Sequence, residues 1–178
     1  SKIKNLLESE DVLNCLSALR TLGVKIVKNN NIYLVYGNGL NSFKPGKKVT
    51  KIYVGNSGTT ARLLSGLLST HNGKFYLYGD SSMNKRDMSR IIKPLKKIGC
   101  FFYPKKKLTL PLTIVGTSMP LAQKHIENKG SAQIKSSILL SALSTPGTTT
   151  IEEEKISRNH TEIFLNKIAA DIKIKRLK

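Results

Sequence analysis

Several residue types are scarce, and each scarcity argues against a class of protein. The sequence has no tryptophan, two cysteines, and 11 acidic residues against 30 basic ones. Cys15 and Cys100 are too few for a disulfide framework, and we expect both to stay reduced. No apolar run is as long as a membrane span, and the charges of the opening SKIKNLLESEDV argue against an export signal. We therefore expect a cytoplasmic protein, with 178 residues that suffice for one core.

Signatures of common cofactor sites are also absent from the sequence. Neither the phosphate-binding pattern GxxxxGKS/T nor the dinucleotide pattern GxGxxG occurs. No pair of cysteines or histidines has the spacing of metal ligands, because His71, His125 and His160 stand far apart. We expect no metal and no organic cofactor, and we read the histidines as surface or packing residues, with His160 as the one candidate exception.

The net charge of +19 favours anionic partners, such as nucleic acid, acidic lipid or phosphorylated metabolites. Lysine is abundant throughout the chain, so a general compositional bias explains the charge equally well. The five Phe and six Tyr form no stacking motif, and the basic runs 105–107 and 173–178 are not interleaved with aromatic residues. We therefore rank dedicated nucleic-acid binding below metabolite binding.

Short segments recur along the chain. ALRTLG (18–23) is echoed by PLKKIG (94–99) and by FLNKIA (164–169), and LLSGLLST (63–70) is echoed by ILLSALST (138–145). The repeat of roughly 70–76 residues is too long for a common solenoid. The first two echoes end in a glycine suited to the end of a helix. We interpret residues 1–178 as one domain of stacked α/β units, which begins and ends partway through a unit.

Hydrophobic spacing predicts which segments form helices and strands. Helical faces are predicted at Val12, Leu16 and Leu19, at Met88, Ile91, Ile92 and Leu95, and at Ile134, Ile138 and Ala142. Strand pairs are predicted within 24–37, with a turn at Asn29–Asn31, and within 100–116; single strands are predicted at 74–79, 148–154 and 171–178. The expected order is helix, hairpin, helix, strand, helix, hairpin, helix, strand, helix, strand.

Three predicted helices start with small polar residues. The starts are Asn56–Thr60, Gly130–Gln133 and Ser157–Glu162. Free N–H groups at a helix start attract anions, and a glycine lets a ligand touch the backbone. Each start taken alone is explained by ordinary N-capping. Repeated units place equivalent starts on one edge, so together they favour a shared anion site.

Basic residues near helix starts add to this interpretation. Lys85 and Arg86 lie between a strand and a helix, Arg90 follows one turn later, and Arg62 lies in the first turn after Gly58. Positive charge at a helix N-terminus opposes the helix dipole, so these positions suggest function more than stability. Arginine holds a carboxylate or phosphate with two parallel hydrogen bonds. The residues alone predict a domain that binds a small, multiply anionic metabolite.

Five ordered segments resemble motifs of the 5-enolpyruvylshikimate-3-phosphate (EPSP) synthase family. They are NLLESEDVLNCLSALRTLGV, GNSGTTARLL, GDSSMNKRDMSRIIKPLKKIG, GSAQIKSSILLSAL and SRNHTEIFL, and they cover nearly the whole chain. The resemblance implies an α/β (α+β) fold of two similar domains, each with three βαβαββ units around a pseudo-threefold axis. It also implies transfer of the carboxyvinyl group of phosphoenolpyruvate to the 5-hydroxyl of shikimate 3-phosphate. In the family this proceeds by addition and then elimination of phosphate, without metal or organic cofactor, in the shikimate pathway to chorismate and aromatic amino acids.

The resemblance also implies roles for individual residues. Gly58 would leave room beside phosphoenolpyruvate, and this glycine-bearing form is not the alanine-bearing, glyphosate-tolerant type. The implied phosphoenolpyruvate site is Gly58, Arg86 and Gln133; the implied shikimate 3-phosphate site is Ser131, Ala132, Gln133, Ser157 and Arg158; the supporting residues are Asn56, Thr59, Arg62, Lys85 and His160.

Two positions depart from the family motifs. Asp87 replaces the usual proline after Lys-Arg, and we expect it to pair with Arg86 and loosen the aim of that side chain. Asn159 replaces the usual aspartate, which would remove a partner of Arg158.

The family's GDKS-x-SHR segment and its second domain, which carries acidic proton-transfer groups, are not found in the sequence. We therefore expect a partial chain that needs the remainder of the synthase, in cis or in trans, and has no turnover alone. Phosphate release from both substrates above a no-protein control would contradict this. We expect no membrane partner.

Three alternatives remain open. One is a related transferase acting on UDP-N-acetylglucosamine, which should carry a cysteine acid in a mobile loop. The second is a basic RNA-binding or RNA-cyclase-like repeat domain, whose affinity should rise with polynucleotide length and fall with salt. The third is a regulatory or remnant half-domain without chemistry.

Overall fold

The computed structural model describes residues 1–43, 45 and 48–175. Strands and helices alternate along these residues, as the hydrophobic periodicity predicts. The elements are β1 (Lys2–Lys4), α1 (Glu10–Thr21), β2 (Lys25–Asn29), β3 (Ile32–Tyr36), β4 (Thr50–Tyr53), α2 (Gly58–Ser69), β5 (Lys74–Tyr78), the 3₁₀ turn η1 (Met83–Lys85), α3 (Ser89–Lys97), β6 (Phe101–Tyr103), β7 (Leu112–Val115), β8 (Lys124–Glu127), α4 (Ala132–Ala142), β9 (Thr150–Glu153) and α5 (His160–Lys167).

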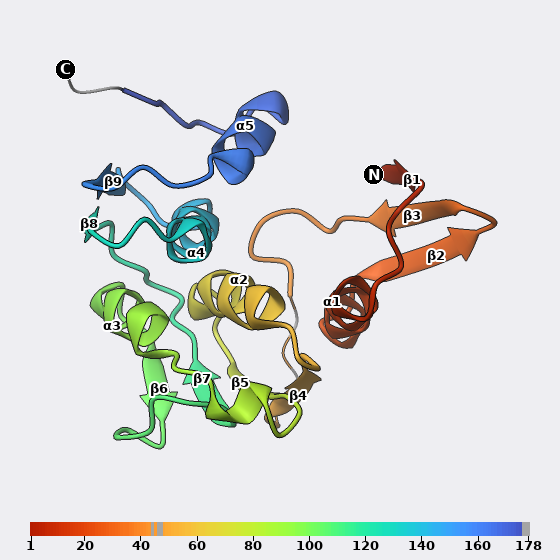
Figure 1. Ribbon diagram of the computed structural model, residues 1–178, viewed down its shortest axis with the longest axis horizontal. Coiled ribbons are helices and arrows are strands. Elements are labelled where there is room, and N and C mark those ends of the chain that lie inside the picture. Colours follow the sequence, from red (N-terminus) through yellow and green to blue (C-terminus); the bar gives the residue numbers. More distant parts are fainter. Residues whose placement is uncertain (44, 46–47, 176–178) are drawn as a thin grey trace.

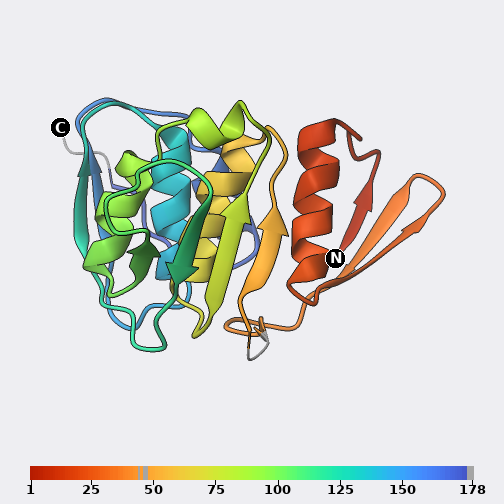
Figure 2. The ribbon, with the colours of Figure 1, turned by 90° about the horizontal axis from the view of Figure 1, so that it is seen from below.

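The strands form sheets that lie outside a group of helices (Figure 1). One sheet has the order β1-β3-β2, a second has the order β4-β5-β7-β6, and β8 pairs in parallel with β9. In the second sheet β4 and β5 are parallel, whereas β5, β7 and β6 pair antiparallel. Figure 2 shows α2 (yellow) and α4 (cyan) behind the strands of the second sheet, with α1 (red) standing beside them. The helices therefore cover the inner face of the second sheet, and no helix among residues 1–43, 45 and 48–175 covers its outer face.

The main core lies between the second sheet and helices α2, α3 and α4. Phe75 and Leu77 point inward from β5 and are fully buried. The α3 face predicted from spacing (Met88, Ile91, Ile92 and Leu95) is buried as well. Each such side chain contributes about 1.5–3 kcal/mol on burial. Helices α2 and α4 approach so closely that a Cβ on Gly66 would lie 2.0 Å from the carbonyl oxygen of Ser137.

The order of elements repeats once along the chain. The series α1-β2-β3-β4-α2-β5 has the same order as α3-β6-β7-β8-α4-β9. Gly23 and Gly99 follow the first helix of each series with φ of +89° and +101°, a conformation that glycine adopts without strain. Both predicted hairpins are confirmed, and Asn30 in the first turn has φ of +50°. The pseudo-threefold arrangement stays a prediction.

The sequence-based order was wrong at the end of the chain. Residues 171–175 form no strand, and the last three residues of the predicted segment lie outside the described residues. The third echo ends in Ala169 instead of glycine, and Ala169 has φ of +59°. Strands β1, β4 and β8 were not predicted from the sequence. Within the described residues, no helix combines the length and the hydrophobicity needed to cross a membrane.

Candidate anion site

The first predicted helix start forms as an N-capped turn after β4. The Ser57 hydroxyl accepts a hydrogen bond of 3.2 Å from the backbone N–H of Thr60. Gly58 is the first residue of α2 and is buried. The capping explanation is therefore correct for Ser57. The Ser57 hydroxyl satisfies one of the four free N–H groups of the first turn, so the other N–H groups can still attract an anion.

Two side-chain hydrogen bonds join the starts of α2 and α4. Nη1 of Arg62 donates to Oε1 of Gln133 over 2.8 Å, and Nε2 of Gln133 donates to the hydroxyl of Thr59 over 2.8 Å. Arg62 also donates to the backbone oxygen of Asp87 over 3.4 Å, which ties in the start of α3. Arg62 therefore links the starts of α2, α3 and α4.

The turn before α2 also receives Arg86. Nη2 of Arg86 donates to the side-chain oxygen of Asn56. A Cβ on Gly58 would lie 2.7 Å from Nη1 of Arg62 and 3.2 Å from Nη1 of Arg86. Glycine at position 58 therefore lets two guanidinium groups approach the start of one helix. An alanine would displace the ends of both arginine side chains.

Positive charge is concentrated at these helix starts. Partial burial lowers the pKa of Arg62, and the nearby charges of Arg86 and Arg90 lower it further. Arg90 has a carboxylate partner, since its Nη2 lies 3.1 Å from Oε1 of Glu127. Like charges gathered beside helix N-termini repel one another and oppose the helix dipoles. A bound anion would relieve both unfavourable interactions.

The loop before α4 is held by the buried carboxylate of Glu127. Its Oε1 accepts hydrogen bonds from the backbone N–H groups of Lys129 (3.0 Å) and Ser131 (3.3 Å). Ser131 is the N-cap residue of α4, but its hydroxyl makes no capping hydrogen bond. That hydroxyl can therefore contact a ligand.

The loop before α5 is fastened to α4 by buried charges. Nζ of Lys135 lies 2.9 Å from Oε2 of Glu153 and 2.5 Å from Oε1 of Glu162. The remaining oxygen of Glu153 accepts hydrogen bonds from the backbone N–H of Ser157 (3.1 Å) and from its hydroxyl (2.5 Å). The hydroxyls of Ser136 and Thr161 lie 2.6 Å apart. These contacts place Ser157 and Arg158 beside the first turns of α4.

The pKa values in this ion cluster reflect its pairing. Burial alone would lower the pKa of Lys135, but the hydrogen bonds to Glu162 and Glu153 outweigh burial and raise it. Burial alone would raise the pKa of Glu153, but hydrogen bonds from Ser157 and Lys135 outweigh burial and lower it. The lysine and Glu153 are therefore both charged at neutral pH.

The structure thus brings together six of the predicted site residues around the starts of α2 and α4. These are Asn56, Gly58, Thr59, Arg62, Arg86 and Gln133. Ala132 is the first residue of α4, and Lys85 ends the η1 turn. Arg158 and His160 are exposed at the start of α5, next to the ion cluster and outside the direct contacts of the other six.

The expected pairing of Asp87 with Arg86 was wrong. The Asp87 carboxylate accepts hydrogen bonds from the backbone N–H (3.0 Å) and the hydroxyl (2.6 Å) of Ser89. These bonds lower the pKa of Asp87. The carboxylate therefore bonds the first residue of α3, a local turn that suits aspartate, and Arg86 contacts Asn56 instead.

Sequence reasoning missed the Lys135 cluster and Glu127. A signal for Lys135 was present, because a lysine inside the apolar segment QIKSSILLSAL needs a buried partner. The partners Glu153 and Glu162 could not be selected from sequence, because they lie on two other elements.

The family of EPSP synthases, 3-phosphoshikimate 1-carboxyvinyltransferases, has a model that matches residues 1–177. The chain belongs to the EPSP synthase family. It is 42% identical over 173 residues to the 3-phosphoshikimate 1-carboxyvinyltransferase of Oenococcus oeni, with 97% of this chain and 39% of the relative covered. It is 35% identical to that of Paramagnetospirillum magneticum, with 98% of this chain and 39% of the relative covered.

The fold agrees with solved structures of the EPSP synthase family. One EPSP synthase structure from Acinetobacter baumannii superimposes with a TM-score of 0.89 at 36% identity, over 98% of this chain and 39% of that chain. The chain thus spans about 39% of the length of the relatives that it matches. The loops before α2, α4 and α5 carry three of the five motifs on which the resemblance is based.

The two cysteines do not suit the alternative transferase with a cysteine acid. Cys15 lies within α1, and burial raises its pKa. Cys100 is 1% exposed, and burial raises its pKa to about 12. A buried thiol with a raised pKa is a poor proton donor.

Proposed function

We propose that this chain binds shikimate 3-phosphate and contributes part of the phosphoenolpyruvate site for the carboxyvinyl transfer of EPSP synthases. The observation that carries the proposal is the joining of the α2 and α4 starts by Arg62 and Gln133, with Arg86 alongside. The N-termini of α2 and α4 and the guanidinium groups of Arg62, Arg86 and Arg90 lie near one another and attract anions that carry several charges. Both substrates of the family are dense anions.

The two substrates would occupy neighbouring parts of the site. Ser131 and Gln133 at the start of α4, with Ser157 and Arg158 from the neighbouring loop, would hold shikimate 3-phosphate. Gly58 and Arg86 at the start of α2 would hold phosphoenolpyruvate. Gln133 contacts both helix starts, so it would lie between the two ligands, where the 5-hydroxyl meets the incoming carboxyvinyl group.

The carboxylates beside this cluster suit positioning more than proton transfer. Asp87 has a lowered pKa because Ser89 donates two hydrogen bonds to it, so it stays ionised. Glu127 is buried and is bound by Arg90 and two backbone N–H groups. A general acid must give up a proton at working pH. We propose that the described residues bind and orient the substrates, and that proton transfer uses groups contributed by the remainder of a synthase.

Isothermal titration calorimetry with shikimate 3-phosphate tests this function. We expect saturable binding with one ligand per chain at 150 mM salt, and a loss of at least tenfold in affinity for Arg158→Gln. Lys167→Gln removes an exposed positive charge from the last residue of α5, at the opposite end of that helix from Arg158, and should leave the affinity unchanged. No binding by the folded chain, or an equal loss in both variants, would contradict the proposal.

A further inference from the structure

The outer face of the β4-β5-β7-β6 sheet carries a cluster of aromatic residues. Directly paired residues share a face, and Tyr53 pairs with Tyr78 while Thr113 pairs with both Tyr76 and Tyr103. Phe101 lies two residues before Tyr103 and shares its face. The apolar residues that alternate with them point to the core and are buried: Ile52, Phe75, Leu77, Phe102, Leu112 and Ile114. Figures 1 and 2 show the helices on that inner side only.

These five aromatic residues are partly exposed, and three of them, Tyr53, Tyr76 and Tyr78, lie close together. Phe101 is 58% exposed, Tyr103 is 44% exposed and Tyr53 is 43% exposed. The ring centroids of Tyr53 and Tyr78 are 5.3 Å apart, and those of Tyr76 and Tyr78 are 5.7 Å apart. We call this set the aromatic sheet face. Exposed aromatic residues grouped on one face of a sheet commonly mark an interaction site.

The charges on the same face are positive. Lys51 pairs with Tyr76, and Lys74 pairs with Val115, so both lysines project from the outer face. The four strands contain no aspartate or glutamate. Asp80 follows β5 by two residues, and its carboxylate accepts a hydrogen bond of 2.7 Å from the backbone N–H of Met83. The lysines therefore have no carboxylate partner on these strands.

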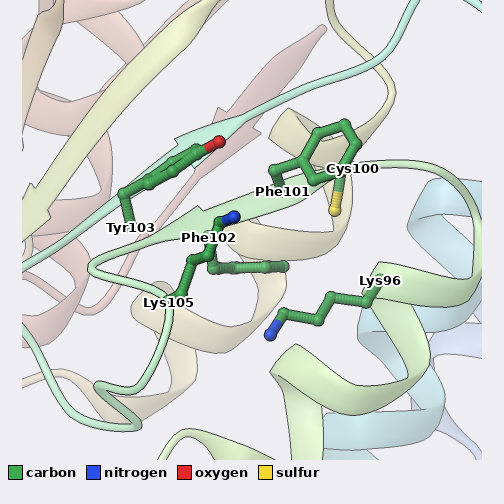
Figure 3. Close-up of a pocket in the computed structure, with 6 residues that line it drawn as sticks. All are labelled: Lys96, Cys100, Phe101, Phe102, Tyr103 and Lys105. Atoms are coloured by element: carbon green, nitrogen blue, oxygen red, sulfur yellow. The ribbon is translucent and has the colours of Figure 1, made fainter.

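An open cavity of about 230 Å³ lies at the edge of the sheet beside β6, between β6 and α3. Phe101, Phe102 and Tyr103 contribute to its wall, and Lys96 and Lys105 approach it from α3 and from the segment after β6 (Figure 3). The cavity therefore combines aromatic surface with two ammonium groups. This is the chemistry that holds a base and its phosphate.

We propose that the aromatic sheet face binds single-stranded nucleic acid. Bases would stack on the exposed rings, and phosphates would contact Lys51, Lys74 and Lys105. Charge complementarity favours this occupant, because a second copy of a chain with net charge +19 would bring lysines against lysines. An acidic protein would match the charge but not the row of flat rings. None of these residues belongs to the anion site, so this inference is independent of the proposed function.

Fluorescence anisotropy of labelled dT15, an unstructured strand, tests the proposal. We expect saturable binding at 50 mM salt and at least tenfold weaker binding by Tyr53→Leu/Tyr103→Leu, because leucine keeps apolar cover but cannot stack. Tyr36→Leu is the matched control, since Tyr36 is 48% exposed on a strand of another sheet. Its affinity should stay within twofold of the unaltered chain. Circular dichroism and thermal melting establish that each variant is folded.

A charge variant supplies a second readout that does not depend on the tyrosines. Lys51→Ala/Lys74→Ala should reduce the slope of log affinity against log salt by about 1.4, since each phosphate contact contributes about 0.7 on a single strand. Lack of binding at 50 mM salt would overturn the proposal. So would equal losses in the control and test variants, or equally tight binding of heparin, which carries charge but no bases.

Discussion

Arg62 and Gln133 lie 71 positions apart in the chain, yet their side chains meet over 2.8 Å. The contact joins the fifth residue of α2 to the second residue of α4. It uses the amide oxygen of Gln133, while the amide nitrogen donates to Thr59 on the same neighbouring helix. One glutamine therefore fixes the spacing of the two helix starts that form the candidate site.

We predict that Gln133→Glu separates structural from ligand effects. The glutamate keeps an acceptor for Arg62, so the free energy of unfolding should change by less than about 1 kcal/mol. The added negative charge should repel an anionic ligand and weaken shikimate 3-phosphate binding at least tenfold. Calorimetric titration and urea unfolding measure the two effects. An unchanged affinity would show that Gln133 lies outside the ligand site.

We predict that Gly58→Ala mainly alters binding of phosphoenolpyruvate. The new methyl group would lie 2.7 Å from Nη1 of Arg62 and 3.2 Å from Nη1 of Arg86, and both flexible side chains can move aside. Stability should therefore change by less than about 1 kcal/mol. Phosphoenolpyruvate affinity in the presence of shikimate 3-phosphate should fall at least tenfold, because Arg86 is displaced.

Gly66→Ala is the matched contrast on the same helix. Its methyl group would meet backbone, at 2.0 Å from the carbonyl oxygen of Ser137, so α2 and α4 would have to separate. The free energy of unfolding should fall by about 1–3 kcal/mol. If the two alanine variants had the same stability, the close approach of the helices at Gly66 would be contradicted.

We predict that Lys135→Met destabilises the fold by about 3–5 kcal/mol. The change leaves Glu162 and Glu153 without their buried partner, and an unpaired buried charge is costly. Lys129→Met, at an exposed lysine close to the start of the same helix, should change stability by less than about 0.5 kcal/mol. Urea unfolding at pH 7 measures the free energy of unfolding of both variants. A Lys135→Met/Glu162→Gln chain should recover part of the loss.

We predict that Glu153 contributes to the acid sensitivity of the protein. Its folded pKa lies below the ordinary value of 4.5, so its contribution to stability is present above that value and is lost as pH falls below it. Glu153→Gln should be destabilising by about 2 kcal/mol at pH 7. The difference in the free energy of unfolding between this variant and the unaltered chain should shrink as pH is lowered from 5 to 3. A constant difference across this range would contradict the pairing with Lys135.

Local sequence signals predicted the elements and the loops of the site well. Gly23, Gly99 and the helical face around Ile91 and Ile92 follow from local backbone and periodicity rules, and the structure confirms them. The GNSGTTAR and GSAQ segments lie at helix starts, as their small polar residues predicted. These features depend on neighbours within one turn or one strand, so the sequence carries them directly.

Features that depend on distant pairings were not predictable in the same way. Lys135 meets Glu162 only because α5 packs on α4. The aromatic residues showed no stacking motif in the sequence, but sheet pairing brings Tyr53, Tyr78 and Tyr103 onto one face. Asp87 was expected to contact Arg86, but its carboxylate caps the nearer N–H of Ser89. In each case the folded arrangement of the backbone, and not the sequence pattern, determines which residues make contact.

The most direct test of the anion site is the change in backbone ¹H–¹⁵N spectra on adding shikimate 3-phosphate. We expect the largest shifts at the amides of Ser131–Gln133 and Ser157–Arg158, with smaller shifts at the start of α2. The amides of the aromatic sheet face should stay unchanged. Shifts confined to the lysines of that face, or spread evenly over the basic surface, would contradict the account that the helix starts form the ligand site.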